Sequence, residues 1–145
     1  MRVIDLFAGC GGLSLGFEKS GFDIIAAFDN WKEACDVYEA NFSHPVFQID
    51  LSDVKDSKFF KKWRADMIIG GPPCQDFSSA GKRDETLGRA NLTVSYARII
   101  SDAKPEWFVM ENVERITKSG ALKEATDIFR SCGYGLSSKV LNASY

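Results

Sequence analysis

The stretch of residues 2–13 reads RVIDLFAGCGGL, and it decides the fold. Its first five residues form an apolar run with the length of a buried β-strand, and the residues after Gly12 show helical periodicity. Between them, Gly9, Gly11 and Gly12 let the backbone adopt positive φ and approach a ligand closely. The start of the following helix offers N–H groups without intrahelical partners. The stretch therefore predicts a strand, a ligand-binding turn and a helix, in that order.

The rest of the chain alternates apolar runs with helical periods. Strands are expected at residues 2–6, 23–28, 45–49, 66–69, 106–110 and, after a turn, within 133–141. Helices are expected at residues 11–20, 31–42, 56–64, 92–103 and 122–132. This alternation predicts an α/β fold with a doubly wound, mostly parallel sheet and helices on both faces. Sheets of this type bind ligands at the carboxyl ends of their strands.

Composition narrows the class of protein. The 145 residues are 45% hydrophobic and 12% aromatic, which is enough to bury a core and argues against disorder. The length predicts a single domain over residues 1–145. No apolar run has the length of a membrane span and no signal peptide is recognisable, so a cytoplasmic or nucleoid-associated location is expected. The net charge of −2 argues against a chain that binds nucleic acid over its whole surface.

The cysteines and the lone histidine carry few predictions of their own. Cys10, Cys35, Cys74 and Cys132 are too widely spaced for a CxxC metal site, so no metal is expected. Cys35 and Cys132 fall on apolar helix faces, where a cysteine is typically core filler. Cys10 and Cys74 fall in glycine- and proline-rich turns, where filler is a poorer explanation. His44 precedes a proline in a loop and is assigned no role.

Two aspartates follow predicted strands, at the edge where a ligand would bind. Asp29, after the second strand, could accept hydrogen bonds from both hydroxyls of a ribose, and Asp50, after the third, could accept from an adenine amino group. An isolated aspartate in such a place is more often a helix cap or turn former. With the glycine-rich turn, however, three such features on consecutive strands favour a nucleoside ligand. The turn itself matches neither a P-loop nor a GxGxxG dinucleotide motif.

A second motif, GGPPCQDFS, spans residues 70–78 at the end of a very apolar strand. Two prolines stiffen the backbone before Cys74, and the glycines admit a ligand on the strand side. A thiol fixed at the ligand-binding edge is a candidate nucleophile, whose thiolate would need a positive neighbour or a helix N-terminus nearby. The alternative is an inert turn cysteine. The segment 75–91 that follows is long for a compact domain and is a candidate lid.

A third motif, Glu111-Asn112-Val113, follows the apolar strand at residues 106–110. A carboxyl group at such a strand end can have a raised pKa and then serve, in its protonated form, as a proton donor. The alternative is a solvated loop residue, and the motif by itself does not decide between the two.

Taken together, the three motifs resemble the signature of cytosine-C5 DNA methyltransferases, in this order and at these spacings. The resemblance covers residues 2–113 and includes Gly81-Lys82-Arg83 and the spacing of Arg89 to Leu92. It implies a class I, Rossmann-like fold and the activity of a DNA (cytosine-5-)-methyltransferase. The implied cofactor is S-adenosyl-L-methionine, with S-adenosyl-L-homocysteine as product, and the implied partner is double-stranded DNA.

The resemblance also implies roles for individual residues. Cys74 would attack C6 of a flipped-out cytosine while Glu111 holds the base, and Asn112 would brace the turn that carries Pro73 and Cys74. The other implied residues fall into two groups. The cofactor would be contacted by Phe7, Gly9, Cys10, Gly12, Leu13, Asp29, Asn30, Asp50, Leu51, Gly71, Pro73 and Leu92. DNA would be contacted by Gln75, Ser78, Lys82, Arg83 and Arg89.

The sequence departs from the family pattern in two respects. Asn30 stands where the family often has an aromatic residue that stacks on adenine. The family's arginine motif, target-recognition region and last helix do not follow, so we expect a partial domain, completed by further C-terminal sequence or by a second polypeptide. Two alternatives stay open: a tRNA cytosine-C5 methyltransferase of the same family, and a cofactor-binding or regulatory subunit without turnover.

Overall fold

The computed structural model describes residues 1–53, 58–73, 92–142 and 144. Five parallel strands form one sheet in the order β3-β2-β1-β4-β5. The strands are β1 (Arg2–Leu6), β2 (Asp23–Asp29), β3 (Val46–Gln48), β4 (Met67–Gly70) and β5 (Trp107–Met110). The helices are α1 (Gly12–Lys19), α2 (Lys32–Asn41), α3 (Lys58–Lys61), α4 (Leu92–Ala103) and α5 (Gly120–Ser131), with 3₁₀ turns at Leu51–Asp53 and Glu114–Lys118. This arrangement confirms the predicted doubly wound parallel fold.

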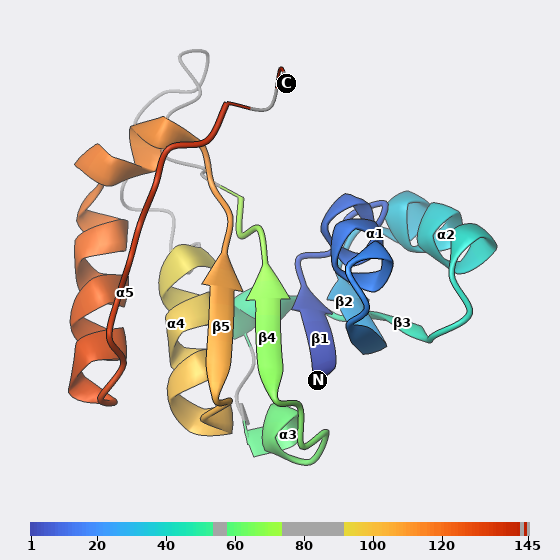
Figure 1. Ribbon diagram of the computed structural model, residues 1–145, viewed down its shortest axis with the longest axis horizontal. Helices are drawn as coiled ribbons and strands as arrows, with labels where there is room; N and C mark the ends of the chain where they lie inside the picture. The colour runs from blue at the N-terminus through green and yellow to red at the C-terminus, as the bar shows by residue number, and fades with distance from the viewer. Residues whose placement is uncertain (54–57, 74–91, 143, 145) are drawn as a thin grey trace.

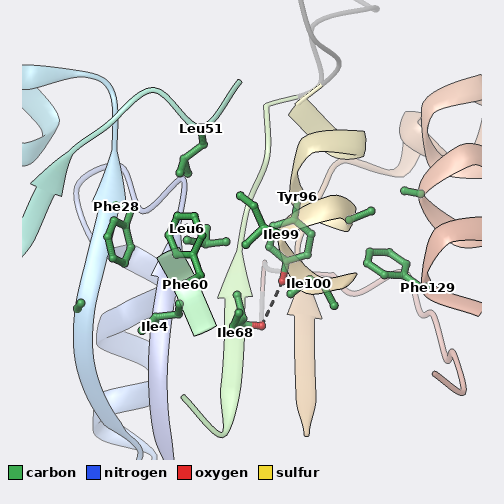
Figure 2. Packing of buried hydrophobic residues seen from close by; sticks show 13 residues of the cluster. Ile4, Leu6, Phe28, Leu51, Phe60, Ile68, Tyr96, Ile99, Ile100 and Phe129 are labelled. Carbon is green, nitrogen blue, oxygen red and sulfur yellow. Dashed lines mark hydrogen bonds between the residues drawn. The ribbon is translucent and has the colours of Figure 1, made fainter. Parts of the chain in front are cut away.

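The side chains of each strand alternate between two apolar layers, which is why the apolar runs are continuous. On one face, Ile4, Leu6 and Ile68 belong to one apolar cluster that also contains residues of α3, α4 and α5 (Figure 2). Tyr96 of α4 is fully buried there, and its hydroxyl donates to the carbonyl oxygens of Ile68, at 3.1 Å, and Val109, at 3.0 Å. Helices α1 and α2 lie on the opposite side of the sheet (Figure 1). The fold thus has helices on both faces, as predicted.

The face of the sheet toward α1 contains a second, smaller apolar layer. Val3 of β1 and Ile69 of β4 are buried there against Leu13 and Phe17 of α1. Asp5 points to this face too, because it lies two residues after Val3 in the same strand. Asp5 is fully buried, so a carboxyl group occupies the middle of an otherwise apolar layer.

One prediction about the C-terminal part was wrong. Residues 133–141 do not form a strand: within the described residues this segment makes no ladder with β5, and Val140 and Leu141 are exposed. Tyr134 instead holds the segment beside the sheet, because its hydroxyl donates to the carbonyl oxygen of Pro105 at 2.6 Å. Strand β5 forms where a strand was predicted, although Trp107 is 57% exposed. The apolar runs were read correctly, but burial also depends on a neighbouring element.

The cysteine predictions can be compared with three of the four positions. Cys35 is buried on α2, as expected for core filler, and burial raises the pKa of its thiol. Cys132 is only half-buried, and its sulfur lies 3.1 Å from the hydroxyl of Ser101. Cys10 is exposed in the glycine-rich turn. Cys74 lies outside the described residues.

Candidate functional site

A pocket of about 230 Å³ opens at the carboxyl ends of the strands. Its walls come from the turns after β1, β2, β3 and β4 and from the first residue of α4. The lining residues are Phe7, Asp29, Asn30, Trp31, Ile49, Asp50, Leu51, Gly71, Pro73 and Leu92. Eight of the residues expected to contact a cofactor are in this set. The other four, Gly9, Cys10, Gly12 and Leu13, belong to the adjoining glycine-rich turn and the start of α1.

The glycine-rich turn has a backbone that only certain residues allow. Gly9 has a φ of 54° and Gly11 a φ of 92°, and a Cβ added to Gly11 would collide with the ring of Phe42 and lie 2.9 Å from that of Tyr38. Gly11 is therefore required both for its positive φ and for the close approach of α2. Phe7 also has a positive φ, of 58°, which is strained for a bulky residue and is found mostly at functional sites.

Asp29 ties the glycine-rich turn to the turn after β2. Its Oδ2 accepts a hydrogen bond from the backbone N–H of Gly9, and its Oδ1 accepts one from Trp31, both at 2.8 Å. Each carboxylate oxygen can accept a second hydrogen bond. Asp29 is thus a turn former that also lines the pocket, so the two interpretations raised by the sequence are compatible.

Asp50 occupies the same kind of position one strand further along. Its Oδ1 accepts a 2.8 Å hydrogen bond from the backbone N–H of Ser52, which lies in the short 3₁₀ turn after β3. Hydrogen bonds from the Ser52 side chain and backbone lower the pKa of Asp50. The group is therefore a carboxylate at neutral pH, and it presents negative charge and acceptor oxygens to the pocket.

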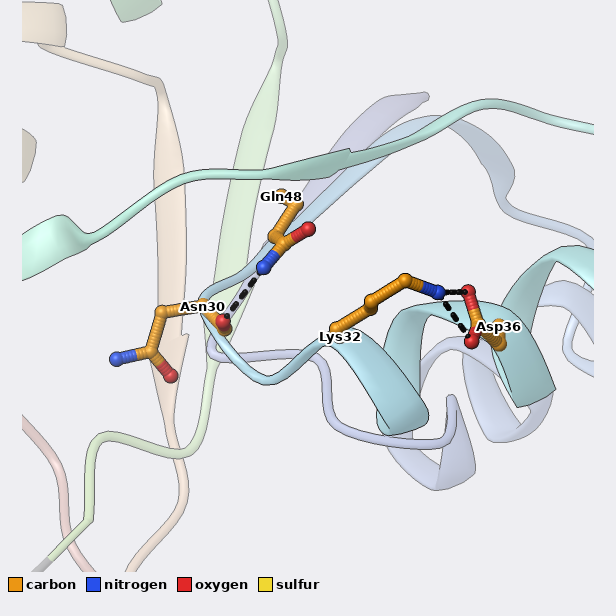
Figure 3. Close-up of polar contacts among 4 residues, drawn as sticks. All are labelled: Asn30, Lys32, Asp36 and Gln48. Atoms are coloured by element: carbon orange, nitrogen blue, oxygen red, sulfur yellow. Dashed lines mark hydrogen bonds and ion pairs between the residues drawn. The ribbon is translucent and has the colours of Figure 1, made fainter.

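Asn30 and Trp31 form the part of the wall between β2 and α2. The backbone oxygen of Asn30 accepts a 3.3 Å hydrogen bond from Gln48 of β3, and the Asn30 side chain extends away from that contact (Figure 3). The ion pair of Lys32 and Asp36, at 2.7 Å, lies on the exposed surface of α2. Trp31 is 62% exposed although it borders the pocket. Its indole is thus available to a ligand.

Trp31 was missed as a site residue by sequence reasoning. It was counted among the apolar positions of the helix at residues 31–42, but the structure places it before the first residue of α2. Its position two residues after Asp29, at the end of a strand, was the available signal, because ligand-binding residues gather at that edge.

The ends of β4 and β5 are joined by two hydrogen bonds and a close approach at Gly71. The backbone N–H of Glu111 donates to the carbonyl oxygen of Gly70 at 2.9 Å. The Nδ2 of Asn112 donates to the carbonyl oxygen of Pro72 at 2.7 Å, and a Cβ on Gly71 would lie 3.1 Å from Oε2 of Glu111. The described residues of the second motif, 70–73, therefore lie beside the third motif, and Gly71 and Pro73 extend this region into the pocket wall.

Six predicted site residues cannot be placed. Cys74, Gln75, Ser78, Lys82, Arg83 and Arg89 lie outside the described residues, as does the candidate lid at residues 75–91. The prediction that Cys74 is a nucleophile therefore rests on the sequence. What the structure adds is the setting of Pro72 and Pro73, whose backbone is held by Asn112.

The chemistry of the pocket suits a nucleoside better than a phosphate. Two aspartates supply hydrogen-bond acceptors, an indole supplies a flat apolar surface, and Ile49 and Leu51 supply aliphatic contacts. The nearest carboxylates would repel a phosphate group. Among the described residues, no three His, Cys, Asp or Glu side chains are grouped closely enough to hold a metal ion. No helix in the described part of the chain is long and apolar enough to cross a bilayer.

Comparison with known proteins gives a consistent result. Residues 1–145 match the profile of the family described as C-5 cytosine-specific DNA methylase. The type II methyltransferase M.HindV of Haemophilus influenzae is 58% identical over 146 aligned residues, which cover 100% of this chain and 48% of M.HindV. The type II methyltransferase M.HgiDI of Herpetosiphon aurantiacus is 52% identical over 145 residues, with coverage of 99% and 47%. The chain thus spans about half the length of these two relatives.

A solved structure supports the fold independently. The DNMT2 methyltransferase of Spodoptera frugiperda, solved as a triple mutant, is 28% identical and superimposes with a TM-score of 0.74. The superposition covers 90% of this chain and 41% of DNMT2.

Proposed function

Because the chain belongs to the C-5 cytosine-specific DNA methylase family, we propose that it forms the cofactor-binding and catalytic part of an enzyme that methylates C5 of cytosine in double-stranded DNA. The methyl donor of this family is S-adenosylmethionine. The observation that carries the proposal is the hydrogen bond of Asn112 to Pro72, because it joins the two motifs assigned to catalysis beside the pocket assigned to the cofactor.

The described pocket fits S-adenosylmethionine, which supplies an electrophilic methyl group when bound. Asp29 would accept from the ribose hydroxyls. Asn30 would lie beside the adenine, and Asp50 would accept from the adenine amino group. The indole of Trp31 would stack on the adenine ring. Trp31 would thus supply the aromatic surface that was not identified from the sequence alone. Gly71, Pro73 and Leu92 would close the methionine side, where methyl transfer takes place.

Catalysis would require a cytosine flipped out of the duplex, because its C5–C6 edge is inaccessible within the stack. The Cys74 thiolate would form a bond to C6, and Glu111 would hold the base through N3 and the exocyclic amine, so that C5 becomes nucleophilic. After C5 accepts the methyl group, a base would remove the C5 proton and the bond from Cys74 to C6 would break. Asn112 would keep the turn before Cys74 in place during these steps.

DNA recognition would be shared with residues other than these 145. Lys82, Arg83 and Arg89 would neutralise phosphates, and Gln75 and Ser78 would lie near the flipped base, but phosphate contacts do not specify a sequence. The relatives M.HindV and M.HgiDI are about twice as long as the matched region. We therefore propose that target recognition lies in further sequence of the same polypeptide or in a complementary second one, as part of a type II restriction–modification methyltransferase.

The proposal is tested by methyl transfer with the full-length protein. Purified protein is incubated with radiolabelled S-adenosylmethionine and, in separate reactions, with duplex DNA and with tRNA. Label in 5-methylcytosine of the DNA supports the proposal. Label in the tRNA alone would favour the tRNA methyltransferase alternative, and binding of the cofactor without any transfer would favour a regulatory subunit.

A further inference from the structure

A row of hydrogen-bonded side chains runs from the centre of the sheet to the surface. The Ser14 hydroxyl donates to Oδ2 of Asp5 at 2.6 Å, and the Tyr38 hydroxyl donates to Oγ of Ser14 at 2.7 Å. The Tyr38 hydroxyl also lies 2.6 Å from Nε2 of His44. The first three side chains are fully buried and His44 is half-buried. We call these four residues the buried relay: Asp5, Ser14, Tyr38 and His44.

The buried relay contacts the glycine-rich turn from both sides. Asp5 lies in β1 just before the turn, and Ser14 lies in the first turn of α1 just after it. The ring of Tyr38 packs where a side chain on Gly11 would otherwise stand. Gly11 is the N-cap of α1 and brings no capping side chain, and the first turn of the helix contains no acidic residue. Asp5 is thus the carboxyl group that accepts hydrogen bonds at this helix N-terminus.

Asp5 is not fully satisfied by these contacts. Its Oδ1 is buried and has no hydrogen-bond partner among the described residues. Burial raises the pKa of Asp5 to about 7, the hydrogen bonds from Ser14 lower it, and the charge of Asp29 raises it. Near neutral pH the group therefore exchanges between a carboxylate and a neutral acid. Asp29 lines the pocket, so the charge on Asp5 is felt at the pocket wall.

The two tyrosines packed around the relay stay neutral in this range. Burial raises the pKa of Tyr38 and of Tyr96, the α4 residue that senses the charge of Asp5. Glu18 faces both Tyr38 and His44, and Asp23 faces His44. Burial lowers the pKa of His44 more than these carboxylates raise it, so its imidazole is neutral near pH 7.

A proton on Oδ1 of Asp5 would have no acceptor among the described residues, so the acid proton belongs on Oδ2. Two arrangements of protons then satisfy all three hydrogen bonds of the buried relay. When Asp5 is a carboxylate, every hydroxyl donates toward it, and His44 must carry its proton on Nε2 in order to donate to Tyr38. When Asp5 is protonated on Oδ2, every bond reverses, and Tyr38 donates to an unprotonated Nε2 of His44. The charge of Asp5 is therefore linked to the tautomer of the histidine at the surface.

We propose that the buried relay carries a proton between solvent and Asp5, and that the charge of Asp5 sets how firmly the glycine-rich turn holds S-adenosylmethionine. In the protonation step, a proton from water binds Nδ1 of His44 while its Nε2 proton passes to the oxygen of Tyr38. The Tyr38 proton passes to Ser14, and the Ser14 proton passes to Oδ2 of Asp5. One proton is taken up, and His44 ends neutral with its proton on Nδ1.

Asp5 is a positioning residue in this account, since it acts on the cofactor through the turn. The carboxylate form caps α1 and accepts from Ser14, whereas the neutral form loses the attraction to the helix N-terminus. The carboxylate also favours a ligand that carries a sulfonium cation, because Asp29 couples Asp5 to the pocket. Cofactor binding should therefore favour the carboxylate and release a proton near neutral pH. This second half of the inference rests on the proposed function.

The relay itself is tested without the cofactor. We would record the ¹⁵N resonances of the His44 ring in the full-length protein between pH 6 and 9 and assign them with His44→Gln. The expected result is a change from the Nδ1–H to the Nε2–H tautomer as pH rises through about 7, lost in Asp5→Asn and Tyr38→Phe. Tyr134→Phe removes a hydroxyl that bonds to Pro105 instead and should leave the change intact. Ser14→Ala also breaks the relay and should likewise lose the change of tautomer. A tautomer of His44 that is constant across this range in the wild-type protein would overturn the proposal.

The effect on the cofactor is tested by calorimetry in buffers of different ionisation enthalpy. Wild-type protein should release about half a proton per bound S-adenosylmethionine at pH 7, with affinity up to about tenfold weaker at pH 6 than at pH 8. Asp5→Asn should abolish both effects. Binding without proton release would overturn the link from Asp5 to the cofactor even if the tautomer of His44 changes. If wild-type protein binds no S-adenosylmethionine at all, the proposed function fails, and the link to the cofactor fails with it.

Discussion

The Nδ2 of Asn112 donates a 2.7 Å hydrogen bond to the carbonyl oxygen of Pro72, which lies 40 residues earlier in the chain. The Oδ1 of Asn112 accepts from the backbone N–H of Val113 at 2.9 Å. The side chain thus fixes its own turn with one atom and the turn before Cys74 with the other. A substitution of Asn112 can therefore remove one of these two contacts and keep the other.

Asn112→Asp should retain the contact with Val113 and lose the contact with Pro72, because a carboxylate has no hydrogen to donate. We expect methyl transfer to slow by on the order of tenfold or more, since a misplaced nucleophile is costly, while affinity for S-adenosylhomocysteine changes little. Single-turnover kinetics and calorimetry on the full-length protein would measure the two effects. Asn112→Ala, which loses both contacts, should be slower still. A rate for Asn112→Asp equal to that of the wild type would show that Pro72 needs no such support.

Asp29→Ala should weaken S-adenosylmethionine binding by about 1.5–3 kcal/mol for each hydrogen bond lost by the charged group. Part of this loss would come from the glycine-rich turn, because the carboxylate holds the N–H of Gly9 as well as facing the pocket. Calorimetry would measure the affinity. The matched control is Asp36→Ala, which removes an exposed carboxylate paired with Lys32 and should leave the affinity unchanged. Equal affinities for wild type and Asp29→Ala would reduce Asp29 to a turn residue.

Trp31→Ala should weaken binding of S-adenosylhomocysteine by roughly 1–3 kcal/mol, the range for a base stacked on an aromatic side chain. Trp31→Phe should recover most of the loss, because a phenyl ring still presents a flat face. Trp107→Ala, which removes an exposed indole from β5, is the control and should not alter affinity. A loss of affinity from Trp107→Ala as large as that from Trp31→Ala would argue against stacking at residue 31.

Stability should depend on pH through Asp5. Its pKa is about 7 in the folded protein and near 3.8 in the unfolded chain, so the folded state binds more protons between these values. The free energy of unfolding contributed by this group is therefore fully present below about pH 4 and is lost as pH rises through 7. Between pH 5 and pH 8 the wild type should lose on the order of 2 kcal/mol more than Asp5→Asn.

Urea unfolding of both proteins at the two pH values would measure this difference. Asp36→Asn, at an exposed position, should follow the wild type. If Asp5→Asn and the wild type show the same dependence on pH, Asp5 does not titrate near neutral pH in the folded protein.

The sequence was sufficient to predict the sheet, because each strand is a continuous apolar run that ends in a distinctive turn. The pocket followed from the same pattern, since the carboxyl ends of parallel strands meet at one edge. The strand predicted within residues 133–141 does not form. An alternation of apolar and polar residues does not show whether a neighbouring strand is available for pairing. Strand β5 was predicted correctly, but its apolar run does not show that Trp107 and Val109 are exposed.

The buried relay could not have been predicted from the sequence. Ser14, Tyr38 and His44 are separated by up to 30 positions and belong to no motif, and only the packing of α1 against α2 brings their polar atoms together. Asp5 was within the first motif, but a strand residue two positions after Val3 gives no sign that its carboxyl group will be buried. The sequence also did not show that Asp29 both holds two turns and lines the pocket, because both of its hydrogen-bond partners are backbone N–H groups.

The central claim is that Cys74 forms a covalent bond to the target cytosine, and duplex DNA containing 5-fluorocytosine at target sites tests it most directly. Fluorine at C5 leaves no proton to remove, so the bond from Cys74 to C6 should persist after methyl transfer. We predict that full-length protein with S-adenosylmethionine gives an adduct that survives denaturing electrophoresis, with the DNA attached at Cys74 on peptide mass spectrometry. Cys74→Ser should give none. Absence of an adduct with the active wild-type enzyme, or an adduct that persists in Cys74→Ser, would contradict the account.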